Sequence, residues 1–152
     1  MTVYRIGRTK YAKDLAGEGA RLNGGRWNHK LTSCLYTSEN RALAVLEYTV
    51  NVNIDDIPRA LSLTTIEIPD KPILQLEISE LPGDWRMTPT PASTKDFGTE
   101  LLKKREYGII KVPSVVIPEE YNFLLNPFHK DSFKFIIREV SDFIYDVRIK
   151  VK

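Results

Sequence analysis

The most constraining feature of this sequence is the stretch of residues 24–47, which reads GGRWNHKLTSCLYTSENRALAVLE. It opens with a glycine pair, whose backbone can turn sharply and approach a ligand closely. The apolar run 34–37 then predicts a short strand. Ser38 is a candidate cap for a helix that begins near Asn40. A turn, a strand and a helix are therefore expected in close succession.

An acidic residue interrupts the apolar side of the expected helix. Leu43, Leu46 and Val50 recur at three- and four-residue spacing and form a stripe along one face. Glu47 falls inside this stripe. Because a carboxylate on an inward face is costly without a cation, hydrogen bonds or a ligand to compensate it, Glu47 marks a candidate site.

The rest of the chain predicts an α+β fold with mainly antiparallel sheet and few helices. A second helix is expected to follow a cap at Ser93 or Thr94, to run to about residue 106 and to stop at Gly108. The stretches 12–25 and 119–127 are expected to be ordered loops. Strands are predicted at residues 3–6, 34–37, 61–68, 73–78, 109–117, 133–140 and 143–151.

Length and composition limit the classes of function. The chain has 152 residues, which is typical of one domain with a proper core, here spanning 1–152. A formal net charge of +2 gives no indication of direct nucleic-acid binding. The single Cys34 excludes a disulfide framework and a cysteine metal cluster, and no metal site is expected. No apolar stretch is long enough for a bilayer, so we expect a soluble, cytoplasmic protein without membrane contact.

Residue types alone leave two interpretations of the polar candidates open. The guanidinium of Arg26 suits a phosphate or carboxylate ligand, but Arg26 and Glu47 would also make a buried structural ion pair. Ser114 follows a proline inside the predicted strand 109–117, where a bulge would re-aim its side chain. Asn122 and Asn126 are by default loop-capping residues.

Five motifs in order favour one of these interpretations. GGRWN, LYTS, ALAVLE, VPSVVIPEEYNFLLNP and the following His129 together resemble the RES domain family, and the resemblance covers nearly the whole chain. It implies a single RES domain with a fold similar to ADP-ribosyltransferase toxins and an activity that consumes NAD+. NAD+ is then a substrate, and no metal is implied.

The resemblance also assigns residues. It implies catalytic roles for Arg26, Tyr36 and Glu47, with Glu47 stabilising the ribosyl cation, Arg26 gripping phosphate and Tyr36 orienting the nicotinamide ring. Arg26 and Tyr36 are thereby also substrate-binding residues. The remaining expected substrate-binding residues are Ser114, Asn122 and Asn126.

The implied function is that of the toxin of a type II toxin–antitoxin system, which depletes NAD+ by hydrolysis or phosphorolysis of the nicotinamide–ribose bond and arrests growth. The expected partner is an Xre-like antitoxin, through which DNA would be contacted, and a homodimer is expected by resemblance alone. Two alternatives stay open: a mono-ADP-ribosyltransferase that modifies a cellular protein, and a non-catalytic interaction domain in which Arg26 and Glu47 form a structural pair.

Overall fold

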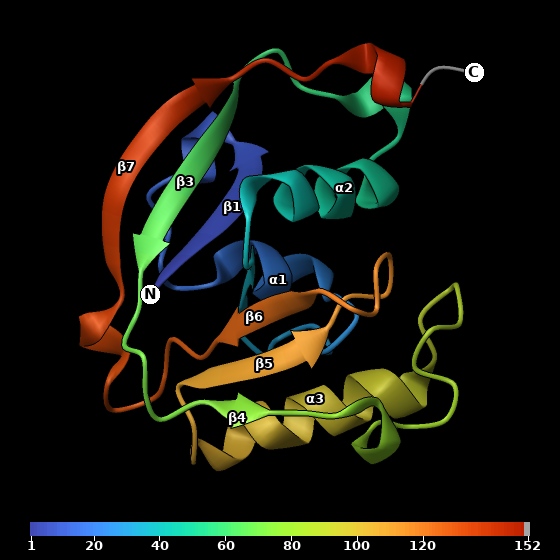
Figure 1. The fold of residues 1–152 in the computed structure, drawn as a ribbon, viewed down its shortest axis with the longest axis vertical. Coiled ribbons are helices and arrows are strands. Elements are labelled where there is room, and N and C mark those ends of the chain that lie inside the picture. Colours follow the sequence, from blue (N-terminus) through green and yellow to red (C-terminus); the bar gives the residue numbers. More distant parts are fainter. Residues whose placement is uncertain (151–152) are drawn as a thin grey trace.

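A seven-stranded sheet in the order β4–β5–β6–β2–β1–β3–β7 forms the centre of the fold (Figure 1). The computed structural model describes residues 1–150. The only parallel pair in this part of the chain is β4 with β5, so the α+β class with mainly antiparallel sheet is confirmed. The strands are β1 (Thr2–Arg8), β2 (Leu35–Ser38), β3 (Leu61–Glu67), β4 (Leu74–Gln75), β5 (Ile109–Pro113), β6 (Tyr121–Leu125) and β7 (Ile136–Phe143), and the helices are α1 (Glu18–Asn23), α2 (Arg41–Asn51) and α3 (Ala92–Lys104).

The sheet is strongly twisted, and two hydrophobic cores pack against it. In Figure 1, β1, β3 and β7 run along the upper left, β5 and β6 cross the lower half above α3, and β4 overlaps α3 in this view. The first core packs α3 and two tryptophans against β5 and β6; it includes Trp27, Trp85, Leu102, Val112 and Leu124. The second core joins the two halves of the sheet; it includes Val3, Leu35, Ile66, Phe123 and Leu125. Helix α2 packs against β1 and β2, so it lies where the two halves meet.

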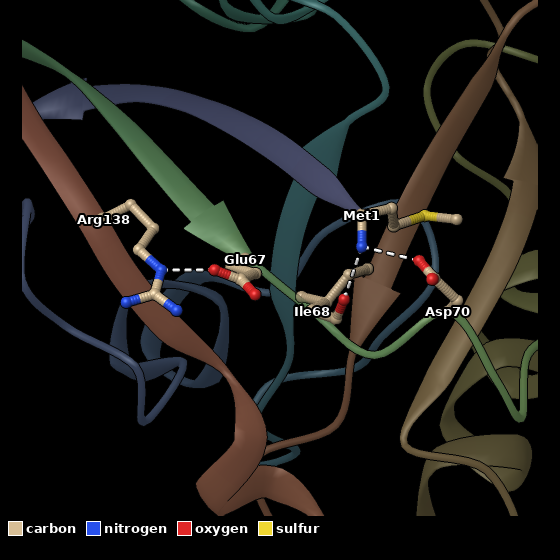
Figure 2. Close-up of polar contacts among 5 residues, drawn as sticks. All are labelled: Met1, Glu67, Ile68, Asp70 and Arg138. Carbon is tan, nitrogen blue, oxygen red and sulfur yellow. Dashed lines mark hydrogen bonds and ion pairs between the residues drawn. The ribbon is translucent and has the colours of Figure 1, made fainter.

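Polar contacts connect β1, β3 and β7 at one end of the sheet (Figure 2). The amino group of Met1 donates to the carbonyl of Ile68 at 2.8 Å and to the carboxylate of Asp70 at 2.7 Å. Beside them Arg138 of β7 pairs with Glu67 of β3. These groups are largely exposed, so we expect them to align the strand ends more than to stabilise the fold.

The structure corrects the prediction around Ser114. Strand β5 ends at Pro113, four residues before the predicted end, because the Ser114 hydroxyl accepts hydrogen bonds from the amides of Val116 and Ile117 and closes a turn. The expected loop 119–127 instead contains β6, which pairs with both β2 and β5. Its pairing with two partners, a long-range property, decides its conformation.

The predicted strand at 143–151 is also wrong as far as residues 143–150 are concerned. Strand β7 takes Phe143 as its last residue, and the alternating segment after it forms a short 3-10 turn at Val147–Ile149, capped by Asp146. Residue 151 lies outside the described residues. Alternation alone cannot make a strand where no neighbouring strand offers a partner.

The helix ends differ from the expected caps. Asn40, not Ser38, caps α2, since its Oδ1 accepts from the amide of Leu43 at 2.8 Å. Helix α3 begins at Ala92 and has Lys104 as its last residue; the C-cap is Arg105, in the left-handed conformation, rather than the expected stop at Gly108. The glycine-rich segment 12–25, expected to be a loop, contains α1. Within residues 1–150, no helix is long and apolar enough to cross a lipid bilayer.

Candidate active site

A cavity of about 650 Å³ opens beside α2, with Arg26, Tyr36, Glu47 and Asn122 in its wall. We call it the Glu47 cavity. Four of the six predicted site residues thus come together, although they are contributed by the glycine-rich turn, β2, α2 and β6.

Glu47 reaches this cavity because of its position on α2. Leu43 and Ala44 are buried against the sheet, and Glu47 follows them by four and three residues, so it lies on the same face of the helix. Val50, expected in the same stripe, is instead 57% exposed, because the inward face continues to Thr49. Glu47 is therefore a half-buried carboxylate on an otherwise apolar helix face.

Two side chains hold one oxygen of this carboxylate. The Ser114 hydroxyl and the Asn122 side-chain amide both donate to Glu47 Oε1, each at 2.6 Å. The Ser38 hydroxyl donates to Asn122 Oδ1 at 2.7 Å and thereby orients the amide. Among the described residues no group donates to Oε2 of Glu47. The carboxylate is therefore fixed through one oxygen while the other is left for a ligand.

Strand register places these donors. Asn122 of β6 lies between Ser38 of β2 and Val112 of β5 in adjacent registers. Ser114 comes two residues after Val112, at the point where β5 ends. Because neighbouring strands bring paired residues about 5 Å apart, two side chains that lie 67 and 75 residues after Glu47 in the sequence converge on its carboxylate.

Arg26 is anchored from the other side by a loop. Its Nη1 donates to the carbonyls of Trp85 and Met87, at 2.8 and 2.9 Å. Partial burial lowers the pKa of Arg26, and the nearby Glu47 carboxylate opposes this effect. Arg26 and Glu47 form no ion pair, so the alternative of a structural Arg26–Glu47 pair is wrong for this structure. The guanidinium keeps Nε and Nη2 without a protein acceptor among residues 1–150.

Tyr36 uses its hydroxyl to hold the glycine-rich turn. It donates to Asn28 Oδ1 at 2.6 Å and accepts from the amide of Trp27 at 2.9 Å. Burial raises the pKa of Tyr36 well above its usual value, so the hydroxyl stays protonated and is unsuited to act as a base. A Cβ at Gly25 would lie 2.6 Å from this hydroxyl, which explains the glycine there. Only the ring of Tyr36 remains to contact a substrate.

Two predicted substrate-binding residues do not contact the cavity. Ser114 is fully buried, and its hydroxyl is already committed to Glu47, Val116 and Ile117. Asn126 is 1% exposed, donates to the carbonyl of Leu102 and accepts from the amide of Phe128. Their contact with substrate stays a prediction; in this structure Ser114 holds Glu47, and Asn126 joins α3 to the end of β6.

Sequence reasoning missed three residues that build the site. Asn28 is fully buried and donates to the carbonyls of Ala20, His29 and Thr32, so it holds the whole turn; its place in the GGRWN motif was the available signal. For Ser38 the sequence predicts only a helix cap, whereas its hydroxyl orients Asn122. Nothing in the sequence indicates that the loop containing Trp85 and Met87, here called the Trp85 loop, holds Arg26.

Cys34 lies in the core, where it is 2% exposed. Complete burial raises the pKa of the Cys34 thiol, which makes it a packed core residue. In residues 1–150, no group of three or more His, Cys, Asp or Glu side chains is placed to hold a metal ion.

With this geometry established, comparison with known proteins decides the family. A family model described as RES domain matches residues 2–147. This chain belongs to the RES domain family. It is 37% identical over 145 residues to the Prs ADP-ribosylating toxin of Sphingobium sp. (strain YBL2), covering 93% of this chain and 90% of that protein. It is 39% identical over 153 residues to Toxin Res of Yersinia enterocolitica serotype O:8 / biotype 1B (strain NCTC 13174 / 8081), covering 99% of this chain and all of that protein.

A solved structure supports the fold of this RES domain. The chain is similar, with a TM-score of 0.74 and 20% sequence identity, to a chain in the crystal structure of the M. tuberculosis MbcT–MbcA toxin–antitoxin complex. The match covers 93% of this chain and 83% of that one. The predicted family and the predicted ADP-ribosyltransferase-like α+β fold are thus both confirmed.

Proposed function

We propose that this RES domain is the toxin of a toxin–antitoxin pair and that it consumes NAD+ by cleaving the nicotinamide–ribose bond. The observation that carries the proposal is the state of Glu47. It is a half-buried carboxylate in a cavity wall, held through Oε1 by Ser114 and Asn122, with Oε2 unpartnered among the described residues.

The reaction needs a negative charge beside a cation that forms during bond cleavage. When the bond from ribose C1′ to the nicotinamide nitrogen breaks, its electron pair moves to the positively charged ring and neutralises it. C1′ is left with oxocarbenium character, which Glu47 stabilises while Oε2 accepts a hydrogen bond from the 2′-hydroxyl. Water or phosphate then donates an oxygen lone pair to C1′ and loses a proton.

The other two catalytic candidates position the substrate. Arg26 offers Nε and Nη2 to a phosphate, while Nη1 stays on the Trp85 loop. The Tyr36 ring offers an aromatic surface for nicotinamide. Asn122 both holds Glu47 and lines the cavity, so it is also placed to touch the ribose.

A partner is part of the proposal. The relatives are named toxins, and the structural neighbour was solved with its antitoxin. We therefore expect an Xre-like antitoxin that binds this chain, covers the Glu47 cavity and carries any DNA contact. The near-balanced charge of +2 supports this division of tasks.

A second candidate is mono-ADP-ribosyl transfer to a protein, favoured by the name of the Sphingobium relative. Such transfer often uses a second carboxylate near the first to activate the acceptor. Here Glu47 is the only acidic residue in the wall of the Glu47 cavity, as far as residues 1–150 are described. Glu39, the acid that precedes Glu47 in the chain, accepts from the amide of Tyr121 instead. Water or phosphate is therefore the favoured acceptor.

The test is proton NMR of the purified protein with NAD+, in buffers with and without phosphate. We expect free nicotinamide, together with ADP-ribose where water is the acceptor or, in the buffer that contains phosphate, a phosphorylated ADP-ribose where phosphate is the acceptor. Glu47→Gln keeps the side-chain volume and removes the charge, and we expect it to lower the rate by about a thousandfold.

The matched control is Glu106→Gln, an exposed acid near the end of α3, which should cleave NAD+ like the unchanged protein. Nicotinamide release by folded Glu47→Gln at the normal rate would overturn the proposed mechanism. Release of nicotinamide only when a cell extract is added, with ADP-ribose mass appearing on one protein, would establish the transferase instead.

A further inference from the structure

The wall of the Glu47 cavity contains more cations than carboxylates. Three cations line it, Arg5, Arg26 and Lys95, against the single carboxylate of Glu47. Arg5 is fully engaged, because its two terminal nitrogens donate to the carbonyls of residues 11, 12 and 14. It therefore braces the turn after β1, and only Arg26 and Lys95 remain for a ligand.

Lys95 differs from the other two cations in having no partner. Its ammonium forms no ion pair or hydrogen bond with any group among residues 1–150, although the side chain is half-buried. The carboxylate beside it in sequence, Asp96, is taken by His29 at 2.5 Å. An ammonium without a protein acceptor in the wall of a cavity is placed to bind an anionic ligand.

The ammonium of Lys95 lies next to the turn that carries Arg26. Its Nζ lies 3.7 Å from the point that a Cβ at Gly24 would occupy, so the ammonium reaches over the turn two residues before Arg26. Gly24 has a φ of +71°, which favours glycine at this point of the turn.

The packing of α3 on the same turn makes this placement rigid. Gly98 lies so close to Trp27 that a Cβ there would come within 2.0 Å of the Trp27 carbonyl oxygen. The amide of His29 donates to the Thr99 hydroxyl at 2.9 Å. Since Gly98 and Thr99 follow Lys95 by three and four residues, they share its helix face, and the face that holds the turn also presents Lys95.

We infer that Lys95 and Arg26 together bind the diphosphate of a dinucleotide, so that Lys95 is a substrate-positioning residue that selects molecules carrying a diphosphate. This inference rests on the proposed function for its substrate. Two cations at one glycine turn, both in the wall of the Glu47 cavity, match the two negative charges of a diphosphate. Glu47 is left for the ribose that loses nicotinamide.

The experiment is isothermal titration calorimetry with ADP-ribose, which keeps the diphosphate and contains no nicotinamide–ribose bond. We expect Lys95→Ala to weaken binding roughly tenfold or more, because a charge-assisted contact is lost. Its affinity should also depend less on NaCl concentration than that of the unchanged protein. Lys95→Arg should restore most of the affinity. Lys103→Ala, an exposed lysine at the far end of α3, is the matched control and should bind normally.

The outcomes separate this inference from the proposed reaction. Equal affinity of Lys95→Ala and the unchanged protein for ADP-ribose, or weaker binding with an unchanged salt dependence, would overturn the role of Lys95 even if NAD+ is cleaved. Failure of the unchanged protein to bind ADP-ribose would overturn it as well. Salt-sensitive binding that needs Lys95, in a protein that releases no nicotinamide, would uphold this inference and reject the reaction.

Discussion

Glu47 and Arg26, two of the charged residues in the wall of the Glu47 cavity, are held in different ways. Glu47 is fixed by side chains from regular elements, Ser114 after β5 and Asn122 in β6. Arg26 is fixed by backbone carbonyls of an irregular loop, on a turn that is itself held by Tyr36. The carboxylate therefore depends on a few side chains, and the cation depends on the shape of two loops.

This difference predicts how each side responds to substitution. A change in a donor to Glu47 should reduce catalysis while the backbone stays in place, because backbone hydrogen bonds between neighbouring strands hold β5 and β6. A change on the Arg26 side should affect folding stability and substrate binding together, since the same groups hold the loop and the ligand. Three substitutions, in order of expected effect on activity, can break or sharpen this comparison.

The largest effect is expected for Asn122→Ala. It removes a donor to Glu47 Oε1 and leaves the Ser38 hydroxyl without its acceptor. We expect kcat for nicotinamide release to fall about a hundredfold, as for loss of one preorganised donor, with a small change in the denaturation midpoint. Asn53→Ala, on the exposed turn after α2, is the control. Unchanged kcat in Asn122→Ala would mean that Glu47 does not need its side-chain support.

An intermediate effect is expected for Arg26→Lys, which keeps the charge but loses the fork that binds loop and ligand at once. We expect KM for NAD+ to rise about tenfold, and the free energy of unfolding to fall by about 1 kcal/mol as the carbonyls of Trp85 and Met87 lose their donor. Steady-state kinetics and urea denaturation measure the two effects, with exposed Arg59→Lys as control. A kcat effect without any loss of stability would contradict a loop-held cation.

The smallest effect on activity is expected for Tyr36→Phe, because the ring in the cavity is retained. The free energy of unfolding should fall by about 1–3 kcal/mol, since buried Asn28 loses a donor and the amide of Trp27 loses an acceptor. Urea denaturation measures this, with Tyr11→Phe as an exposed control. A drop in kcat larger than for Asn122→Ala would show that the hydroxyl acts in the reaction.

The same variant has a pH signature. The pKa of Tyr36 is raised by burial in the folded state, so its stabilising contribution is present below the unfolded pKa and is lost as the pH rises above about 10. The unchanged protein should lose stability in that range because the unfolded chain releases the phenolic proton. Tyr36→Phe should show a smaller loss, when both are compared by urea denaturation at pH 8 and pH 10.5 or so.

Local patterns predicted the parts of the site that lie within one element. The helical periodicity around Leu43 placed Glu47 on the inward face of α2, and the motif order identified Arg26, Tyr36 and Asn122 as neighbours. The same patterns misplaced β6 and the end of β5, because β6 is a strand only by virtue of two neighbours that come from distant parts of the chain.

The sequence by itself determined the family, the fold class and the identity of the carboxylate and cation, because these follow from local periodicity and from ordered motifs. Only the tertiary structure decided the task of each polar group. In the folded protein Ser114 donates to Glu47, Asn126 lies outside the cavity, and Lys95 lies beside the glycine turn. The physical reason is that a hydrogen bond forms only when donor and acceptor lie within a few tenths of an ångström of their preferred separation. For residues far apart in the chain, that separation is set only when the sheet and helices pack.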